Sequence, residues 1–326
     1  MTFYDVICIG AGPTGLATAI ETKRAGMRSL VLDKGCLCNS LYNYPVNLVF
    51  FTTPELIEIG DLPMVCAGEK PVRNEALRYY RRCAEHEQLE LRLYERVLRV
   101  TGQKGRFTIH TETDLGHRAE YSCAHVVIAT GYYDLPNRMD IPGEDLPHVS
   151  HYYREAHSHW NQDVVVIGGK NSAALAALDL YRAGARVTLI HRRSQLSDRI
   201  KYWIRPDIEN RVKAGEVKAL FSTGVTRIES DQVWVADGQG NSEKVVPASA
   251  VYALTGYHPD FEFLRQQGVT LDAQTNRPAL NAQTHETNVP GIYLAGVVIG
   301  GNNTGEIFIE NGRFHGKQIA AALKNR

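Results

Sequence analysis

Three glycines near the amino terminus, Gly10, Gly12 and Gly15, have the spacing G-x-G-x-x-G. In such a motif the first glycine allows a tight turn, the second lets backbone approach a pyrophosphate, and the third lets a helix pack closely on a strand. Asp33 follows at the distance at which a carboxylate accepts hydrogen bonds from an adenosine ribose. These residue types in this order predict a dinucleotide site, against the alternative of an ordinary glycine-rich turn.

The segments around these glycines must position them, and they have the pattern strand, turn, helix, strand. Residues 6–9 are a continuous apolar run, typical of a strand that is buried on both faces. The predicted helix ends at residues 24–26, with Gly26 as its carboxyl-terminal cap. A second apolar strand at residues 30–32 then leads into Asp33. The start of the helix would offer its N–H groups and its positive dipole end to phosphates.

An internal repeat is the most informative feature of the chain. The segment that begins at Asp163 aligns without a gap with the segment that begins at Asp5, an offset of 158 positions (163 minus 5). Chance similarity of two strand–helix–strand units is the alternative, and the length of the ungapped match argues against it. The matched positions include Gly168 for Gly10, Ala173 for Gly15, and Arg-Ala-Gly at 182–184 for Arg-Ala-Gly at 24–26.

The two copies differ where the choice of ligand is set. The first has Asp33, which suits a free ribose diol, whereas the second has His191 followed by Arg192 and Arg193. Guanidinium groups fork onto a phosphate, so the second copy predicts NADPH, with Arg199 as a third contact. The alternative is that these arginines form a solvated strand end.

Lys170 stands in the second copy where the first has Gly12. A side chain there would crowd the usual backbone approach to a pyrophosphate, or would contact a phosphate itself. A lysine that faces solvent from a loop is an equally good explanation, and the sequence leaves both open.

Two Thr-Gly-Tyr sequences, at 130–132 and 255–257, each end an apolar strand and flank the second copy. They predict two crossings between domains, with the second domain inserted into the first. The expected fold is α/β, with two nested Rossmann-like dinucleotide-binding domains of the three-layer ββα type. The first domain would comprise residues 1–133 and 254–326, and the inserted domain residues 134–253.

Other segments give weaker expectations. Residues 34–45 look like an irregular loop, and His315 is expected in the last helix, near the bound cofactor of the first domain. The remaining patterns predict a helix within 71–88, strands of a small sheet at 89–100 and 106–113, buried strands at 124–130 and 292–295, and a helix that starts near Gly305.

Bulk properties limit the possible functions. The 326 residues suggest two domains, and 36 basic against 36 acidic residues give zero formal net charge, which argues against a nucleic-acid partner. No Lys or Arg precedes Lys23, as a signal peptide would require, and no apolar run is long enough to span a bilayer. Six cysteines in such a chain do not make a disulfide scaffold, so the cytoplasm is expected. The histidine spacing predicts no metal.

The nested dinucleotide units, together with ATG at 129–131 and GIYLAG at 291–296, resemble the pyridine nucleotide–disulfide oxidoreductases in their small, thioredoxin-reductase-like form. Finer motifs resemble the bacillithiol-disulfide (bacilliredoxin) reductase branch, called YpdA-like. These motifs are SLYNYP (40–45), Phe50-Phe51, ATGYY (129–133), GGKNSA (168–173), GYHPD (256–260) and FIENGRFHG (308–316). The resemblance implies FAD in the first domain, NADPH in the second, electron transfer to a small disulfide or a redoxin, and a homodimer.

Site residues follow from the motifs and from the resemblance. For FAD they are Gly10, Gly12, Pro13, Thr14, Gly15, Asp33, Lys34, Ser40, Asn43, Val97, Thr130, Gly131, Gly296, Val297 and Ile307. For NADPH they are Gly168, Lys170, Asn171, Ser172, Ala173, His191, Arg192, Arg193, Arg199 and Gly256.

Two departures from the family leave the acceptor open. Residues 149–162 lack the Cys-x-x-Cys pair of thioredoxin reductases, and Thr14 stands where the resemblance implies a redox cysteine. A hydroxyl cannot form a mixed disulfide. Cys36 and Cys38 are expected on the adenosine side of FAD, away from the reactive ring. An electron-carrier reductase for ferredoxin or flavodoxin, or a flavin-binding sensor or interaction protein, therefore stays beside the disulfide reductase.

Overall fold

The computed structural model describes residues 2–237 and 243–324. The chain divides into two compact units. The first comprises Met1–Asn43, Asn47–Leu135 and Tyr257–Arg326, and the second comprises Tyr44–Val46 and Pro136–Gly256. Tyr44–Val46 belongs to the second unit because the Val46 N–H donates to the Arg154 carbonyl oxygen at 2.9 Å.

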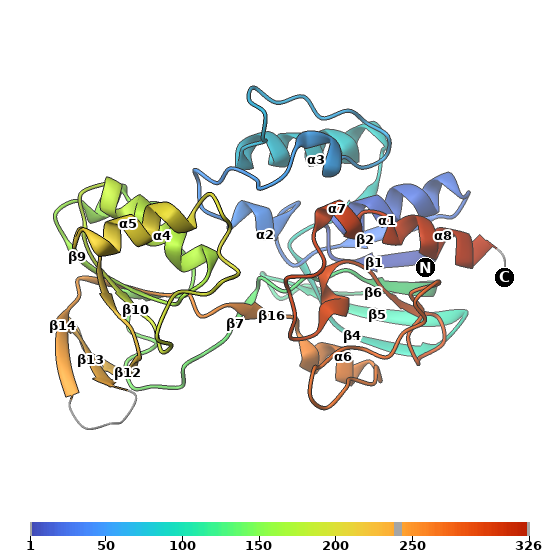
Figure 1. Ribbon diagram of the computed structural model, residues 1–326. Coiled ribbons are helices and arrows are strands. Elements are labelled where there is room, and N and C mark those ends of the chain that lie inside the picture. Colours follow the sequence, from blue (N-terminus) through green and yellow to red (C-terminus); the bar gives the residue numbers. More distant parts are fainter. Residues whose placement is uncertain (1, 238–242, 325–326) are drawn as a thin grey trace. The chain divides into compact units, whose positions relative to one another are not determined.

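The described part of the first unit is built on a seven-stranded sheet (Figure 1). Strands β3, β2, β1, β6 and β17 run parallel, and β4 and β5 continue from β6 in antiparallel order. Their bounds are β1 Phe3–Ile9, β2 Ser29–Leu32, β3 Glu90–Arg92, β4 Glu95–Gln103, β5 Arg106–Thr113, β6 Arg118–Ile128 and β17 Ile292–Leu294. The carboxyl ends of the parallel strands therefore meet at one edge.

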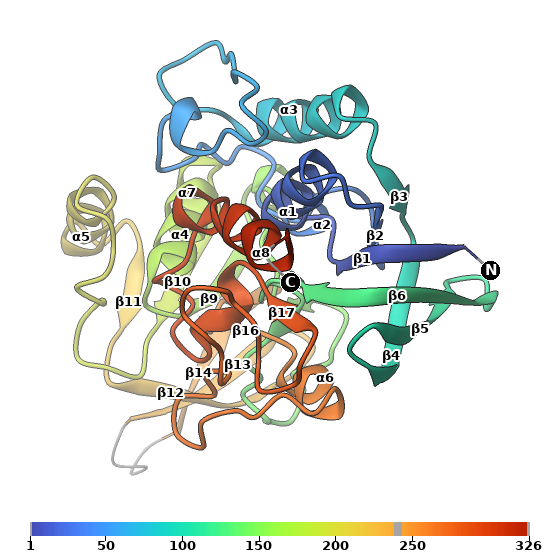
Figure 2. The same cartoon turned by 90° about the vertical axis from the view of Figure 1, so that its right-hand side faces the viewer.

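Both faces of this sheet are covered. Helices α1 (Pro13–Arg24) and α8 (His315–Lys324) lie side by side in Figures 1 and 2 and pack on one face through Ala19 and Ile319. The other face packs against α6 (Phe261–Gln266) through Leu264, in a cluster that also contains Phe107 and Ile109 of β5. This arrangement gives the expected three layers.

The second unit repeats this plan. Its parallel sheet has the order β11-β10-β9-β15-β8. One face packs on helices α4 and α5, and the other on the antiparallel strands β12, β13 and β14. The bounds are β8 Val149–Ser150, β9 Asp163–Ile167, α4 Asn171–Arg182, β10 Arg186–Ile190, α5 Arg205–Lys213, β11 Lys218–Leu220, β12 Thr223–Ile228, β13 Gln232–Asp237, β14 Glu243–Pro247 and β15 Ala250–Ala253.

The repeat in the sequence is a repeat in the structure. Helices α1 and α4 begin and end at positions that differ by the same 158 residues as the two sequence copies. Their ends are closed alike, because Ala25 N–H donates to the Glu21 carbonyl at 3.0 Å and Ala183 N–H to the Asp179 carbonyl at 3.0 Å. The expected α/β fold with two Rossmann-like units is confirmed.

The structure corrects the strand prediction at 89–100. This segment forms two strands, β3 and β4, which lie at opposite edges of the large sheet instead of in a separate small one. The chain turns between them at Tyr94, whose φ of 58° is rare for a residue with a side chain. Strand β6 also starts earlier than expected, at Arg118 instead of 124.

The prediction of a helix near Gly305 is wrong. Helix α7 begins at Ile309, and α8 begins separately at His315. The Asn311 side chain accepts the Phe308 N–H at 2.8 Å and donates to the Glu306 carbonyl oxygen at 2.9 Å, which keeps Phe308 extended. The supposed irregular loop 34–45 also contains a short helix, α2 (Asn39–Tyr42).

The remaining elements are short connections apart from α3. They are η1 Pro54–Leu56, α3 Arg73–His86, β7 Leu135–Pro136, η2 His157–His159, β16 Tyr257–His258, η3 Val297–Gly300 and α7 Ile309–Gly312. Among the described residues, no helix combines the length and the apolar character that a bilayer crossing needs.

Candidate dinucleotide-binding sites

Two of the three glycines in the turn of the first unit leave no room for a side chain. A Cβ atom on Gly15 would overlap the carbonyl oxygen of Gly10, and Gly10 has a φ of 113°, so both positions require glycine. A Cβ atom on Gly12, in contrast, would meet nothing within 4 Å. None of the described side chains caps the first turn of α1, and that turn carries no acidic residue. Its N–H groups are thus left for an anionic ligand.

Asp33 stands at the end of β2 and faces this turn. Its Oδ2 atom accepts the Ala11 N–H at 2.7 Å and its Oδ1 atom accepts the Gly35 N–H at 2.8 Å. Burial raises the pKa of the Asp33 carboxyl, and the two N–H donors act in the opposite direction. Each oxygen keeps a second lone pair, so the carboxylate is oriented and can still accept from a ribose hydroxyl.

A hollow of about 620 Å³ opens beside the residue after Asp33. It is lined by Lys34, Gly35, Cys36, Asn39, Tyr42, Tyr94, Arg96 and Asp114. Lys34 forms an ion pair with Asp134 at 2.9 Å. Among the other predicted FAD residues, Ser40 lies in α2, Asn43 follows the end of α2, and Val97 lies on β4. These three do not line the hollow, although their neighbours do.

The remaining predicted FAD residues gather at the carboxyl edge of the sheet. Thr130 and Gly131 follow β6, which pairs with β1, and Gly296 and Val297 follow β17, which pairs with β6. Thr14 contacts this region, because a Cβ atom on Gly296 would lie 3.1 Å from its Oγ1 atom. Ile307 is also close, since its Cγ2 atom would lie 3.5 Å from a Cβ atom on Gly312.

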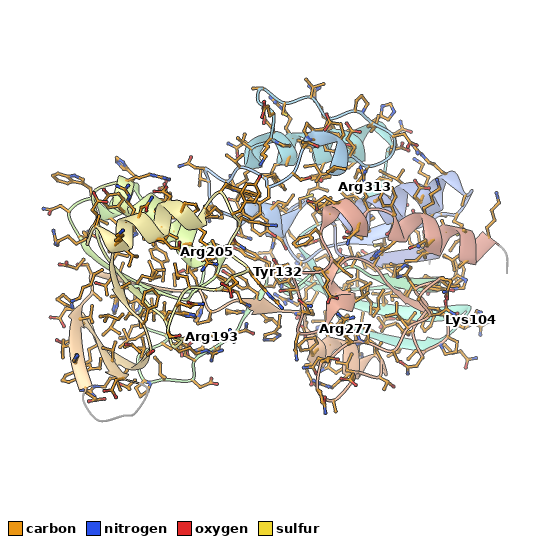
Figure 3. All side chains as sticks on the ribbon, in the orientation of Figure 1. Lys104, Tyr132, Arg193, Arg205, Arg277 and Arg313 are labelled. Atoms are coloured by element: carbon orange, nitrogen blue, oxygen red, sulfur yellow. The ribbon has the colours of Figure 1, made fainter. Side chains whose placement is uncertain are left out.

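Two buried or tethered arginines support this site, and the sequence offered no signal for them. Arg73 is 6% exposed and donates to the carbonyl oxygens of Leu41 at 3.2 Å and Tyr42 at 2.5 Å, at the end of α2. Arg313, labelled in Figure 3, donates to two carbonyl oxygens within residues 55–58, at 2.8 and 2.7 Å. Both arginines hold backbone segments of the first unit in place.

In the second unit His191 takes the place of Asp33. A Cβ atom on Gly169 would overlap the His191 ring, so the imidazole lies directly on the glycine turn. Burial lowers the pKa of His191, and the charges of Arg193 and Arg192 lower it further. The lowered pKa favours the neutral ring, and His191, unlike Asp33, places no carboxylate at the end of its strand. The turn itself is tight, because a Cβ atom on Gly168 would lie 2.6 Å from the Leu254 carbonyl oxygen.

Two arginines follow β10, and a third lies in the loop that Asn171 contacts. Arg192, Arg193 and Arg199 are exposed, and none forms a salt bridge with a carboxylate of the described residues. Figure 3 labels Arg193. Unpaired arginines beside a ribose-binding position suit a phosphate on that ribose. The first unit has a carboxylate at the same position, which would repel one.

Asn171, the first residue of α4, connects the two loops of this site. Its Nδ2 atom donates to the Arg199 carbonyl oxygen at 3.2 Å, and its Oδ1 atom accepts the Lys201 N–H at 2.9 Å. Lys170 precedes it and is exposed, while Ser172 and Ala173 complete the first turn.

Gly256 lies farther along the chain, after β15. Its carbonyl oxygen accepts the Asn137 N–H at 2.8 Å, which joins the segment after β7 to the segment after β15.

The cysteines form no disulfide with one another among the described residues. All six lie within the described residues and are free. Burial raises the pKa of Cys8 to about 12, and it also raises the pKa values of Cys36 and Cys38. A raised pKa disfavours the nucleophilic thiolate. No group of three or more metal-ligating side chains occurs among the residues described.

Comparisons with known proteins agree with this arrangement. The family described as pyridine nucleotide-disulphide oxidoreductase matches residues 7–296. Bacilliredoxin reductase Bdr of Bacillus subtilis is 45% identical over 321 residues, which cover 98% of this chain and 97% of that protein. The solved structure of Bacillithiol Disulfide Reductase Bdr (YpdA) from Bacillus cereus superposes with a TM-score of 0.97 at 42% identity and full coverage of both chains.

A ferredoxin–NADP reductase of Ignicoccus hospitalis is more distant, at 27% identity over 300 residues, which cover 90% of this chain and 89% of that protein. The uncapped glycine turns, the oriented Asp33 and the unpaired arginines fit the two cofactors of such enzymes. The chain belongs to the pyridine nucleotide-disulphide oxidoreductase family and is a flavoprotein oxidoreductase that uses FAD and NADPH.

Proposed function

We propose that this enzyme uses NADPH to reduce the disulfide of a redoxin or of a low-molecular-weight thiol such as bacillithiol. The observation that carries this proposal is the 45% identity, over 98% of the chain, to a protein named Bacilliredoxin reductase. In the overall reaction, NADPH, one proton and one disulfide give NADP⁺ and two thiols.

We assign FAD to the first unit and NADPH to the second. In the first unit the N–H groups at the start of α1 would hold the FAD pyrophosphate, and Asp33 would hold its ribose. In the second unit Arg192 and Arg193 would hold the phosphate on the NADPH ribose. Bound FAD supplies the two-electron chemistry, and the protein supplies orientation.

Thr14 requires a route without a protein thiol at that position. Its hydroxyl cannot attack a disulfide. The cysteines with raised pKa values are poor substitutes. Electrons would therefore reach the acceptor disulfide directly from the reduced cofactor.

A cysteine-free variant tests this route. Cys36 and Cys66, which are partly exposed, would become serine, and the four buried cysteines would become alanine. NADPH-dependent reduction of bacillithiol disulfide and of oxidised bacilliredoxin should stay within about threefold of the wild type. Loss of the reaction, with FAD still bound, would show that a cysteine of this chain takes part.

A second candidate is electron transfer to ferredoxin or flavodoxin. Two observations favour it: the absence of a thiol at position 14, and the similarity to a ferredoxin–NADP reductase across 90% of the chain. The same preparation, assayed with ferredoxin and flavodoxin beside the disulfides, separates the two candidates by their kcat/KM values.

We also infer a cytoplasmic homodimer. The family resemblance supports the dimer, and the free cysteines are compatible with a reducing compartment. Light scattering of the holoenzyme tests the dimer, and fractionation of the source cells tests the location.

A further inference from the structure

Two buried histidines of the first unit lie next to the turn that follows β17. His315 is the first residue of α8 and is 9% exposed, and His285 lies in the preceding loop region and is 5% exposed. Their rings stack at 4.3 Å between centroids with an angle of 26° between the planes. Two imidazoles so close together and so well buried cannot both carry a proton without a large cost.

The hydrogen bonds define the state of each ring. The Gly296 N–H donates to Nδ1 of His315 at 3.1 Å, so this nitrogen carries no proton and the ring is neutral. Nε2 of His285 lies 2.6 Å from Oε1 of Gln318, an acceptor, so this nitrogen carries the proton of His285. The pair is therefore arranged to offer one lone pair to the Gly296 peptide.

The backbone holds both rings in place. His285 has a φ of 59°, in the left-handed region. Two hydrogen bonds keep it there: its N–H donates to the Asn281 carbonyl oxygen at 2.8 Å, and its own carbonyl oxygen accepts the Leu294 N–H at 3.0 Å. The start of α8 cannot shift toward α1, because a Cβ atom on Gly316 would already lie 2.5 Å from Thr18 Cα.

Gly296 is the residue on which this arrangement acts. It has a φ of 82° and begins the turn that carries Val297, and Thr14 lies against its Cα face. Its N–H is used within the protein by His315, so it is not a donor to a ligand. What the turn contributes is its shape, and the bond to His315 sets the plane of the peptide before Gly296.

We propose that His315, supported by His285, is a positioning residue that holds the Gly296–Val297 turn in the form that FAD binding requires. This inference rests on the proposed placement of FAD in the first unit. His315 acts through Gly296 and is not assigned a contact with the substrate.

Two variants of His315 separate the hydrogen bond from packing. In His315→Asn the amide oxygen can take the place of Nδ1 and accept the Gly296 N–H, whereas His315→Leu fills the space without an acceptor. The FAD dissociation constant of the apoprotein, measured by fluorescence titration, should rise about tenfold in His315→Leu and stay within about threefold of the wild type in His315→Asn. The visible spectrum of bound FAD should differ from the wild-type spectrum more in His315→Leu than in His315→Asn.

Controls make the outcome decisive. The NADPH dissociation constant should be equal in the wild type and both variants, because NADPH is assigned to the other unit. Equal FAD affinity in His315→Leu and His315→Asn would overturn the proposal. If His315→Leu does not fold, Gln318→Leu replaces it, because this variant removes the hydrogen-bond partner of His285. It should weaken FAD binding measurably but less than tenfold. An unchanged FAD affinity in Gln318→Leu would overturn the proposal. If Asp33→Asn leaves FAD binding intact, the placement of FAD has failed instead.

Discussion

Thr14 and Gly312 lie so close that a Cβ atom on Gly312 would be 3.1 Å from the Thr14 Oγ1 atom. The same oxygen would lie 3.1 Å from a Cβ atom on Gly296. The side chain at position 14 is therefore enclosed by two glycines that come from the carboxyl-terminal part of the chain. Its identity determines how closely α7 and the turn after β17 can approach α1.

Gly312→Ala should destabilise the protein by about 1–3 kcal/mol, because the added methyl group overpacks against Thr14. Thr14→Ala removes the atoms that the methyl group meets, so the double variant should recover most of this loss. Gly296→Ala should not be rescued by Thr14→Ala, since its φ of 82° strains any side chain. Urea unfolding of the three single and two double variants measures the effect, and simple additivity of Gly312→Ala and Thr14→Ala would contradict the contact.

Replacement of both Arg192 and Arg193 by alanine should lower the preference for NADPH over NADH about hundredfold, because two unpaired guanidinium groups leave the ribose phosphate. Arg186→Ala is a matched control. Arg186 lies at the other end of β10, where it pairs with Asp163 at 2.8 Å, and its loss should leave the preference unchanged. The kcat/KM ratio for the two nucleotides with an artificial acceptor is the measurement. An unchanged ratio in the double variant would show that the phosphate binds elsewhere.

The glycine turns and the helices after them could be predicted from the sequence because their geometry is local. Gly10 and Gly15 have a steric role that recurs in strand–helix turns of this kind. The second copy of the motif in this chain gave an independent test of the predicted turn. The contact of Thr14 with Gly312, in contrast, depends on how distant segments pack. The pairing of His285 with His315 also depends on this packing, since no residue near His285 in sequence predicts its left-handed backbone or its partner.

The element boundaries that the sequence missed have local causes that do not follow from apolar periodicity. Tyr94 turns the chain between β3 and β4 with a positive φ, which the pattern of apolar residues does not encode. Asn311 delays the start of α7 by binding the backbone of Glu306 and Phe308 with its side chain. Such side-chain-to-backbone bonds at the first turn fix where a helix begins, and they are visible only in three dimensions.

Asp33→Asn should strongly reduce FAD binding. The carboxylate accepts two backbone N–H groups, from Ala11 and Gly35, and an amide would bring its own NH₂ group against one of them. The loss of a charge-assisted bond corresponds to about 1.5–3 kcal/mol, or at least a tenfold weaker affinity. Asp134→Asn weakens the partly exposed ion pair with Lys34 but leaves both N–H bonds of Asp33 in place, and it serves as the control. The FAD content after gel filtration distinguishes them, and equal contents would remove Asp33 from the site.

The stability of the apoprotein should rise with pH between about 4 and 6.5. Burial, and to a lesser degree the neighbouring His285, lowers the pKa of His315 from 6.5 to about 4. Within this window the unfolded chain binds more protons at His315 than the folded chain, so the free energy of unfolding increases as the pH increases, and it levels off above the unfolded pKa. The gain is at most about 3 kcal/mol. Burial also lowers the pKa of His285, which adds to the slope in the same direction.

Urea unfolding of the wild type and of His315→Asn at matched pH values isolates this contribution, because carboxylates titrate equally in both. The asparagine variant keeps an acceptor for the Gly296 N–H but has no titrating ring, so its free energy of unfolding should depend less steeply on pH above 5. At pH 7 both imidazoles are neutral, so the free energies of unfolding of the two proteins should differ far less than at lower pH. Parallel curves from pH 4.5 to 7 would mean that His315 is not buried as a neutral ring in solution.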